Sequence, residues 1–205
     1  MRRIFMDNFE DVLRWVAVDT NATSLVEISD VMPFRGGGCL HILNTDGTPT
    51  DAGTINTITK AMLTEHKIYK LSGEMKFGTK TNLTELKIVL RATIDGYQYQ
   101  AGISYKVKND VFHYLAKDGS WKPVFDAPME ILAETWFTFS MELDFANTKI
   151  KEISIAGKTQ DMNSRIYGAV DGTPDRTVTI EIQGMQEGTT GGFELWADSI
   201  RLEGR

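Results

Sequence analysis

Residues 86–94 read LKIVLRATI and residues 97–107 read YQYQAGISYKV, and both runs alternate between apolar and polar or small side chains. Alternation with a period of two is typical of a β-strand that has one buried and one exposed face. Asp95-Gly96, between the two runs, is a strong signal for a two-residue hairpin turn. The two runs therefore predict neighbouring antiparallel strands.

The same period recurs along much of the chain. Further strands are expected at residues 111–116, 136–145, 150–155, 177–183 and 193–202, separated by short turns rich in Gly, Asn and Asp. Helical signals are weak, and only Ile58–Tyr69 and Met129–Glu134 are candidates for short helices. Tyr167–Asp175 is expected to be an irregular loop. With no linker and no repeat, residues 1–205 are expected to form one all-β domain, a sandwich or a barrel.

Composition excludes several classes of protein. The 205-residue chain has a net charge of −6, which argues against a broad nucleic-acid surface and against docking on an anionic membrane. The one cysteine, Cys39, excludes an intramolecular disulfide and is expected to be a small buried side chain. The N-terminus reaches Asp7 and Glu10 where a signal peptide needs its apolar core, so the sequence as written predicts a cytoplasmic protein.

Both ends of the chain resemble a known superfamily. Residues 7–11, DNFED, followed by Trp15, are similar to the opening strand of jelly-roll carbohydrate-binding modules, and residues 193–202, FELWADSIRL, are similar to their closing strand. Residues 136–144 and 150–157 resemble the concanavalin A-like and laminin-G-like pattern. The resemblance implies a two-sheet antiparallel jelly-roll β-sandwich of concanavalin A-like type, whose first and last strands lie near each other. It implies the fold better than the function, because this fold hosts binders, lyases, hydrolases and structural domains.

The resemblance also implies a metal site. In the related modules, acidic residues of the opening and closing strands bind a structural calcium far from the ligand face, and the matching residues here are Asp7, Glu10 and Asp198. Calcium takes six to eight oxygen ligands, so backbone carbonyls and water would complete its shell. The alternative is that these acids cap turns or lie solvated at a strand edge. No other cofactor is expected.

A ligand-binding surface is expected on the polar faces of the strands. If the apolar faces form the core, the opposite faces form a polar sheet surface that offers amides, hydroxyls and charges. The ligand-binding residues expected there are Arg91, Gln98, Gln100, His113, Trp136, Thr138, Glu142 and Glu181. Sugars bind such groups, and an aromatic ring stacks on their apolar C–H face. The alternative is an ordinary solvated sheet face, which antiparallel sheets often have.

Three tyrosines leave the choice of face open. Tyr97, Tyr99 and Tyr105 lie on the apolar side of their run, with Ile103 and Val107. We expect them in the core, with their hydroxyls reaching polar partners at its rim. A curved sheet could instead expose them as a stacking platform for sugars, and the ligand face would then be the other one.

Catalytic signals are incomplete. Glu142-Leu143-Asp144 resembles the glutamate-x-aspartate strand of retaining glucanases, but Ala146 and Asn147 follow where that motif needs a further glutamate as proton donor. Lyase chemistry needs a His or Tyr base near an arginine, and His113, Tyr114 and Arg91 are the candidates if adjacent strands bring them together.

The sequence therefore favours non-catalytic binding of a glycan through a sheet surface and its rim loops. The alternative is a structural or self-assembly domain without a small ligand, and homo-oligomerisation is left open. A glycan-acting lyase or hydrolase is the third hypothesis. Neither nucleic acid nor a membrane is expected as a partner.

Overall fold

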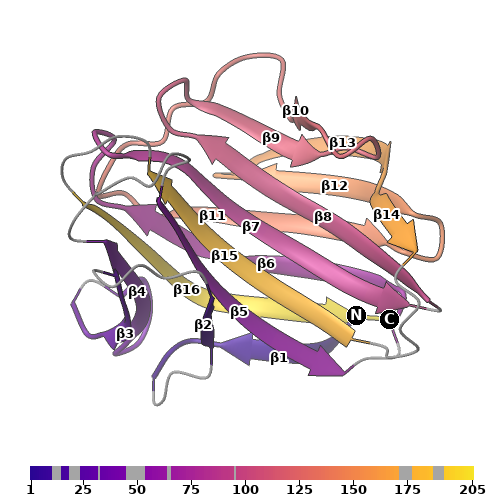
Figure 1. The fold of residues 1–205 in the computed structure, drawn as a ribbon, viewed down its shortest axis with the longest axis horizontal. Coiled ribbons are helices and arrows are strands. Elements are labelled where there is room, and N and C mark those ends of the chain that lie inside the picture. Colours follow the sequence, from indigo (N-terminus) through magenta and orange to yellow (C-terminus); the bar gives the residue numbers. More distant parts are fainter. Residues whose placement is uncertain are drawn as a thin grey trace.

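The computed structural model describes residues 1–10, 15–18, 24–31, 33–44, 54–63, 66–94, 96–170, 177–186 and 192–205. Within these ranges the chain forms sixteen β-strands and no helix. It follows that the described residues contain no helix long and apolar enough to cross a membrane. The strands form two antiparallel sheets that lie against each other as a sandwich (Figure 1). The predicted all-β, two-sheet antiparallel fold is confirmed.

The front sheet, nearer the viewer in Figure 1, has the order β10-β9-β8-β7-β15-β5-β2, and β14 also pairs with β8. Its strands are β2 (Val16–Val18), β5 (Thr54–Leu63), β7 (Leu83–Ile94), β8 (Tyr97–Lys106), β9 (Val111–Leu115), β10 (Trp121–Pro123), β14 (Tyr167–Val170) and β15 (Thr177–Gln186). The predicted hairpin joins β7 to β8, with Ile94 opposite Tyr97. Gly96 in its turn has φ of 79°, a conformation that glycine adopts without steric cost.

The back sheet has the order β13-β12-β11-β6-β16-β4-β3, and β1 pairs with β16. Its strands are β1 (Arg2–Asp7), β3 (Ser24–Ser29), β4 (Cys39–Asn44), β6 (Ile68–Phe77), β11 (Phe137–Asp144), β12 (Lys149–Ile155), β13 (Lys158–Arg165) and β16 (Phe193–Gly204). Arg2 lies opposite Gly204, so the two chain ends meet, as Figure 1 shows. The expected proximity of the first and last strands is confirmed.

The core lies between the sheets and follows the alternation in the sequence. Each strand turns every second side chain inward, and these inward side chains are almost fully buried. They include Ile88, Leu90 and Ala92 of β7, Phe137, Phe139, Met141 and Leu143 of β11, and Val178, Ile180 and Ile182 of β15. Burial of one such large side chain contributes about 1.5–3 kcal/mol. Cys39 is fully buried as expected, and burial raises the pKa of its thiol to about 11.

Three sequence-based expectations are wrong. Residues 54–63 form β5, which pairs along its whole length with β15, and Met129–Glu134 is not helical. Strand pairing outweighs the weak helical propensity of residues 54–63. In the second segment, the amides of Met129 and Glu134 bond instead to the distant carbonyls of Asp110 and Phe77. Tyr167–Val170, expected in a loop, forms β14 against β8.

The three tyrosines of β8 differ in burial. Tyr105 is fully buried and Tyr99 packs against the core, as expected. Tyr97, at the end of the strand, is 48% exposed. The inner side of β8 is therefore a core face over most of its length, which leaves the polar side as the face open to a ligand.

Candidate functional site

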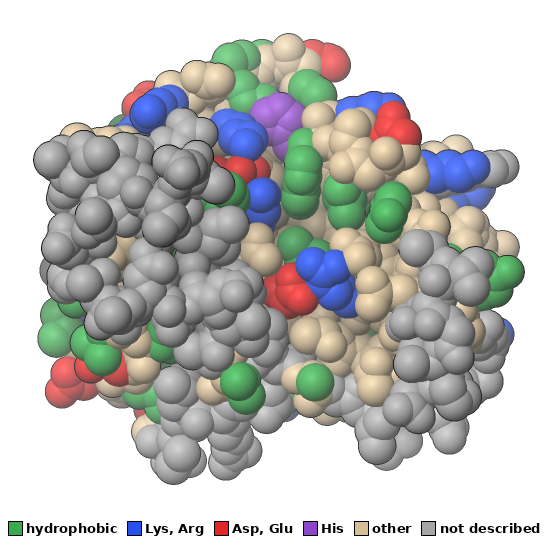
Figure 2. Space-filling view, in the orientation of Figure 1, with side chains coloured by type: hydrophobic (Ala, Val, Ile, Leu, Met, Phe, Trp, Pro, Cys, Tyr) green, Lys and Arg blue, Asp and Glu red, His purple; other side chains and the backbone are tan. Residues whose placement is uncertain are grey.

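The outer side of the front sheet, here called the front face, carries the polar side chains of β7, β8, β9 and β15. Because the inward residues of these strands fill the core, their neighbours in sequence point outward. The front face comprises Glu85, Lys87, Val89, Arg91 and Thr93 of β7, Gln98, Gln100, Gly102, Ser104 and Lys106 of β8, His113 of β9, and Glu181 and Gln183 of β15. Acidic, basic and histidine side chains gather in the middle of this view in Figure 2.

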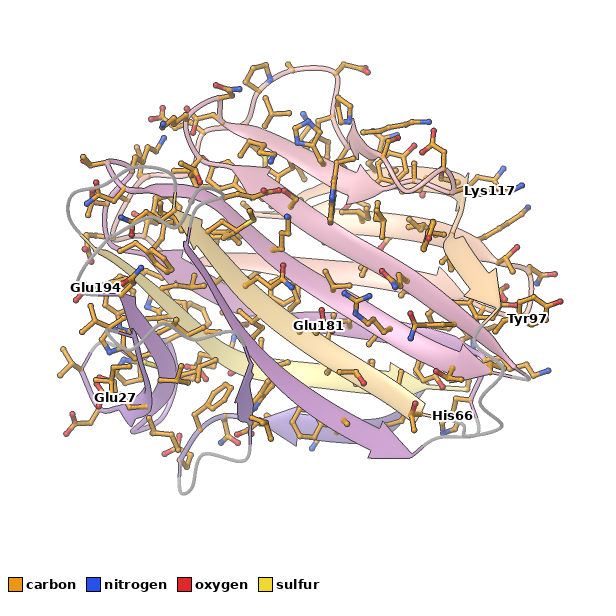
Figure 3. All side chains as sticks on the ribbon, viewed as in Figure 1. Glu27, His66, Tyr97, Lys117, Glu181 and Glu194 are labelled. Carbon is orange, nitrogen blue, oxygen red and sulfur yellow. The ribbon has the colours of Figure 1, made fainter. Side chains whose placement is uncertain are left out.

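The register of β7 and β15 brings a bidentate ion pair, here called the Arg91–Glu181 fork, to the centre of the front face. Arg91 donates through Nε to Glu181 Oε1 at 2.6 Å and through Nη2 to Glu181 Oε2 at 3.0 Å. Gln183 reaches the same Oε2 at 3.5 Å, and Glu181 lies at the middle of the sheet (Figure 3). A bidentate pair of this kind is strong and fixes the direction of both side chains. Along β8, Gln100 Nε2 donates to Gln98 Oε1 at 2.9 Å. The side-chain oxygen of Gln100 takes no part in this hydrogen bond.

A second charged cluster surrounds Glu85. Its Oε2 lies 2.7 Å from Lys106 Nζ and 3.2 Å from Lys87 Nζ, while Ser104 donates to its Oε1. Burial alone would raise the pKa of Glu85, but the hydrogen bonds from Lys106 and Ser104 and the two lysine charges outweigh it and lower the pKa. Glu85 and Lys106 also line a hollow of about 170 Å³ with Thr84, Lys108, Asn109 and Met185.

An aromatic ring lies beside both clusters. A Cβ placed on Gly102 would come within 3.2 Å of the Trp121 ring, so this ring rests on the strand where β8 has no side chain. Val89, next to Gly102 on β7, completes a small apolar floor. Lys87 Nζ lies 5.4 Å from the centre of the Trp121 ring. Trp121 thus combines an apolar ring with a positive charge that lies over the ring.

His113 closes the front face on the β9 side, opposite Ser104. Burial, then the charge of Lys106, lowers the pKa of His113 below its usual 6.5. The neutral imidazole therefore dominates at pH 7 and can act as both hydrogen-bond donor and acceptor.

The expected ligand residues do not share one surface. Arg91, Gln98, Gln100, His113 and Glu181 belong to the front sheet, but Trp136, Thr138 and Glu142 belong to the back sheet or its edge. Thr138 lies opposite Glu74 of β6, and the Trp136 ring packs 5.7 Å from that of Phe34. Glu142 pairs with Lys151 at 2.9 Å. The expectation of a single surface is therefore wrong, because alternation sorts side chains into two faces without saying which sheet a strand joins. Ligand binding by these residues remains a prediction.

The predicted calcium ligands are hydrogen-bonded to N–H groups. Asp7 accepts from the Phe9 amide at 2.9 Å and the Trp15 indole at 3.1 Å. Asp198 Oδ2 accepts from the amides of Phe34 and Arg35, at 3.0 and 2.8 Å.

Both carboxylate oxygens of the third acid, Glu10, lie 3.0 Å from the Gly37 amide. In the part of the chain that the structure describes, no three His, Cys, Asp or Glu side chains form a group that could hold a metal. As arranged, these three acids hold loops in place, and the calcium site remains a sequence-based prediction.

The catalytic candidates are also dispersed. Asp144 accepts from the Asn147 amide and side chain at 3.0 and 2.9 Å, on the back sheet with Glu142. His113 and Tyr114 are consecutive on β9, so they point to opposite sides, and the Tyr114 hydroxyl accepts from Ser164 at 3.2 Å. Neither a pair of free acids nor a His–Tyr–Arg cluster is assembled from these candidates.

A larger hollow, of about 440 Å³, lies at the edge of the sandwich between β9, β10 and β13. Its lining residues are Tyr114, Ala116, Lys117, Asp118, Lys122 and Ser164, and Figure 3 shows Lys117 at this edge. Asp118 pairs with Lys122 at 3.0 Å. The hollow is on the Tyr114 side of β9, away from His113.

Several members of the front face were missed at the sequence level. Glu85 extends the polar side of β7 by the same period of two, so starting the strand at Leu83 instead of Leu86 would have found it. Lys87 lay within the expected strand but was not selected as a ligand-binding residue. Tyr167, which pairs with Gln100 next to the front face, was missed because only turn signals are visible in the sequence around β14. Lys106 was already in the alternating run, but its ion-pair partner Glu85 was not recognised, so nothing marked Lys106 as part of a site.

Comparison with known proteins gives a fold. No family model and no curated protein sequence matches the chain. Among solved structures, an endo-β-1,4-glucuronan lyase from the fungus Trichoderma reesei is 12% identical over 99% of this chain and 96% of that chain, with a TM-score of 0.69. The cellulose-induced protein Cip1 is 13% identical over 97% and 96%, with a TM-score of 0.61. A glycosyl hydrolase family 16 protein from Mycobacterium smegmatis is 12% identical over 98% and 100%, with a TM-score of 0.51. Identities this low show the fold alone, and the fold is a two-sheet jelly-roll β-sandwich.

Proposed function

We propose that this protein binds a glycan non-catalytically on its front face. One observation carries the proposal: the Trp121 ring reaches over Gly102 beside Val89, between the Arg91–Glu181 fork and the Glu85 cluster. A sugar ring has an apolar C–H face and a rim of hydroxyls. The aromatic ring suits the first, and the charged and amide groups suit the second.

The front face is prepared for such a ligand before it binds. Arg91 and Glu181 fix each other, and Gln98 and Gln100 do the same along β8. All four side chains project from paired strands. Groups held in position lose little conformational entropy on binding, which favours affinity for a weakly hydrophobic ligand.

The positions and partners of the candidate acids and bases favour non-catalytic binding over hydrolysis or elimination. Glu142 is paired with Lys151, and Asp144 is hydrogen-bonded to Asn147, both on the back sheet. Tyr114 faces away from His113. Retaining hydrolysis needs two carboxyl groups about 5 Å apart beside the substrate, and the candidates recognised in the sequence do not supply them on the front face.

The structural neighbours agree with a role in carbohydrate chemistry. By their printed names, one of these neighbours is a glucuronan lyase and another is a glycosyl hydrolase family 16 protein. One fold carries both binders and enzymes, so the neighbours support the ligand class more than the reaction.

A thermal melt against a panel of soluble glycans tests the proposal. A ligand that binds only the native state raises the Tm by mass action. We expect one glycan class to raise the Tm, and Trp121→Ala to weaken its affinity at least tenfold in titration calorimetry. The parallel variant Trp136→Ala, on the back sheet, should keep most of the affinity.

Loss of binding in Trp136→Ala but not in Trp121→Ala would move the site to the back sheet. A flat response to the whole panel contradicts glycan binding. The assembly hypothesis would then be tested next, by the mass of the protein in solution.

A further inference from the structure

We propose that the front face selects glycans that carry negatively charged sugars, through surplus positive charge on Lys87, Lys106 and Lys108. This inference rests on the proposed glycan binding and names the ligand class. The anionic group is a carboxylate or a sulfate, which have the same hydrogen-bonding chemistry toward lysine.

The charges around Glu85 do not balance. One carboxylate lies within ion-pair distance of two ammonium groups, those of Lys106 at 2.7 Å and Lys87 at 3.2 Å. Lys108 lines the same hollow and adds a third positive charge. The cluster therefore has a surplus of two positive charges in a chain whose net charge is −6. An acidic protein that gathers cations at one place on a ligand face has the electrostatics expected for an anionic ligand.

Burial divides the cluster into a fixed part and an accessible part. The side chains of Glu85 and Lys87 are 4% and 15% exposed, whereas that of Lys106 is 40% exposed. The buried Glu85 thus fixes the end of the Lys106 side chain, while the Lys106 side chain as a whole remains partly open to solvent. An ammonium group has three N–H donors, so Lys106 keeps donors for a ligand after it has bonded Glu85.

Arg91 is not part of this anion site. Both oxygens of Glu181 accept from its guanidinium, so its charge is compensated within the face. The surplus of positive charge lies instead on the Glu85 side of Trp121. Lys87 contacts both Glu85 and Trp121, with its Nζ 5.4 Å from the centre of the ring. A sugar stacked on Trp121 can therefore direct an acidic substituent to the lysines while its hydroxyls meet the Arg91–Glu181 fork.

Titration calorimetry with three probes tests this inference. The probes are a neutral β-glucan oligosaccharide, an oligogalacturonate and a sulfated galactan oligosaccharide of similar length. We expect at least tenfold tighter binding of one or both acidic probes than of the neutral one at 50 mM NaCl, and a weaker preference at 500 mM NaCl, because salt screens exposed charges. The two acidic probes distinguish the carboxylate from the sulfate.

A matched pair of variants locates the effect. Lys106→Gln should weaken binding of the acidic probe about tenfold and that of the neutral probe much less, because glutamine loses the charge but keeps a hydrogen-bond donor for hydroxyls. Lys151→Gln is the control, because Lys151 is 43% exposed and paired with a glutamate in the same way, but lies on the back sheet. Lys108→Gln, at an exposed position, repeats the test if Lys106→Gln lowers the Tm of the protein.

Three results would overturn the inference. If the neutral probe binds as tightly as the acidic ones, the face binds glycans without charge selection, and the proposed function stands alone. If Lys151→Gln weakens binding as much as Lys106→Gln, net charge and not this cluster causes the preference. If no probe binds, the inference fails, and the melts against the whole glycan panel decide the proposed function.

Discussion

Glu74 of β6 and Asp198 of β16 lie directly opposite each other in the back sheet, so two carboxyl groups share one buried position. Glu74 is 9% exposed and Asp198 is fully buried. Burial raises the pKa of Glu74, the Arg35 charge partly opposes this, and the neighbouring Asp198 raises it further. Within the described part of the chain, Glu74 Oε2 has no hydrogen-bond partner.

We expect Glu74→Gln to stabilise the protein at pH 7 by about 1 kcal/mol, or about 2–4 °C in Tm. As pH rises above 4.5, the unfolded chain loses the Glu74 proton before the folded protein does, so stability falls until the folded pKa is passed. The glutamine has no proton to lose. Urea unfolding at pH 4.5 and pH 7 measures the change, and Glu152→Gln on β12 is the control. Equal effects of both variants would contradict the buried-pair explanation.

Glu85 should respond in the opposite way, because its pKa is lowered. Its ion pairs contribute stability that is fully present above pH 4.5 and is lost as pH falls through the lower folded pKa. Glu85→Gln leaves Lys87 and Lys106 without their common partner, and we expect it to cost about 1–3 kcal/mol at pH 7. The cost should shrink toward pH 3 in urea unfolding. A variant as stable as the parent at pH 7 would show that the cluster contributes nothing to folding.

The predicted calcium site can be tested by removing and restoring the metal. If Asp7, Glu10 and Asp198 bind calcium, EDTA lowers the Tm and added calcium restores it, since a ligand at 100 times its Kd stabilises the native state by about 2.7 kcal/mol. Thermal melts with EDTA, with calcium and with magnesium measure this. The same Tm in all three would leave these carboxylates with the role seen in the structure, as acceptors for N–H groups of nearby loops.

The strands β7 and β11 show how far sequence reasoning reaches. Both were predicted with the correct inward side chains, because alternation against a core depends only on neighbouring residues. Their outward faces were assigned to one surface, yet β7 is in the front sheet and β11 in the back sheet. Sheet membership depends on pairing between distant segments, such as β7 with β15 and β11 with β6. A local pattern does not contain that information.

The candidate site was predicted only in part, again because a local pattern does not show which strands pair. Arg91 and Glu181 were both expected to bind ligand, but the bond between them follows from the pairing of β7 with β15. Glu85 was missed because its strand was begun three residues late, at Leu86 instead of Leu83, and without Glu85 nothing distinguished Lys87 and Lys106 from other outward side chains. The position of Trp121 on Gly102 depends on two successive strand pairings, β10 with β9 and β9 with β8. The alternation within one strand does not reveal either pairing.

Gly102 is predicted to be required for the ligand face, because only a residue without a side chain lets the Trp121 ring rest on β8. A Cβ there would lie 3.0 Å from the Ile88 carbonyl oxygen, 3.1 Å from Val89 Cγ2 and 3.2 Å from Trp121 Cη2. The Trp121 ring can move more easily than the backbone oxygen, so Gly102→Ala should displace the ring and weaken glycan affinity about three- to tenfold, and strain against the oxygen should also lower the Tm. The control is Gly78→Ala, whose Cβ would meet only the Glu194 and Glu134 side chains, no closer than 3.3 Å. Calorimetry and near-UV circular dichroism follow affinity and ring position. Unchanged affinity in Gly102→Ala, with a changed tryptophan signal, would exclude the Trp121 ring as the sugar platform.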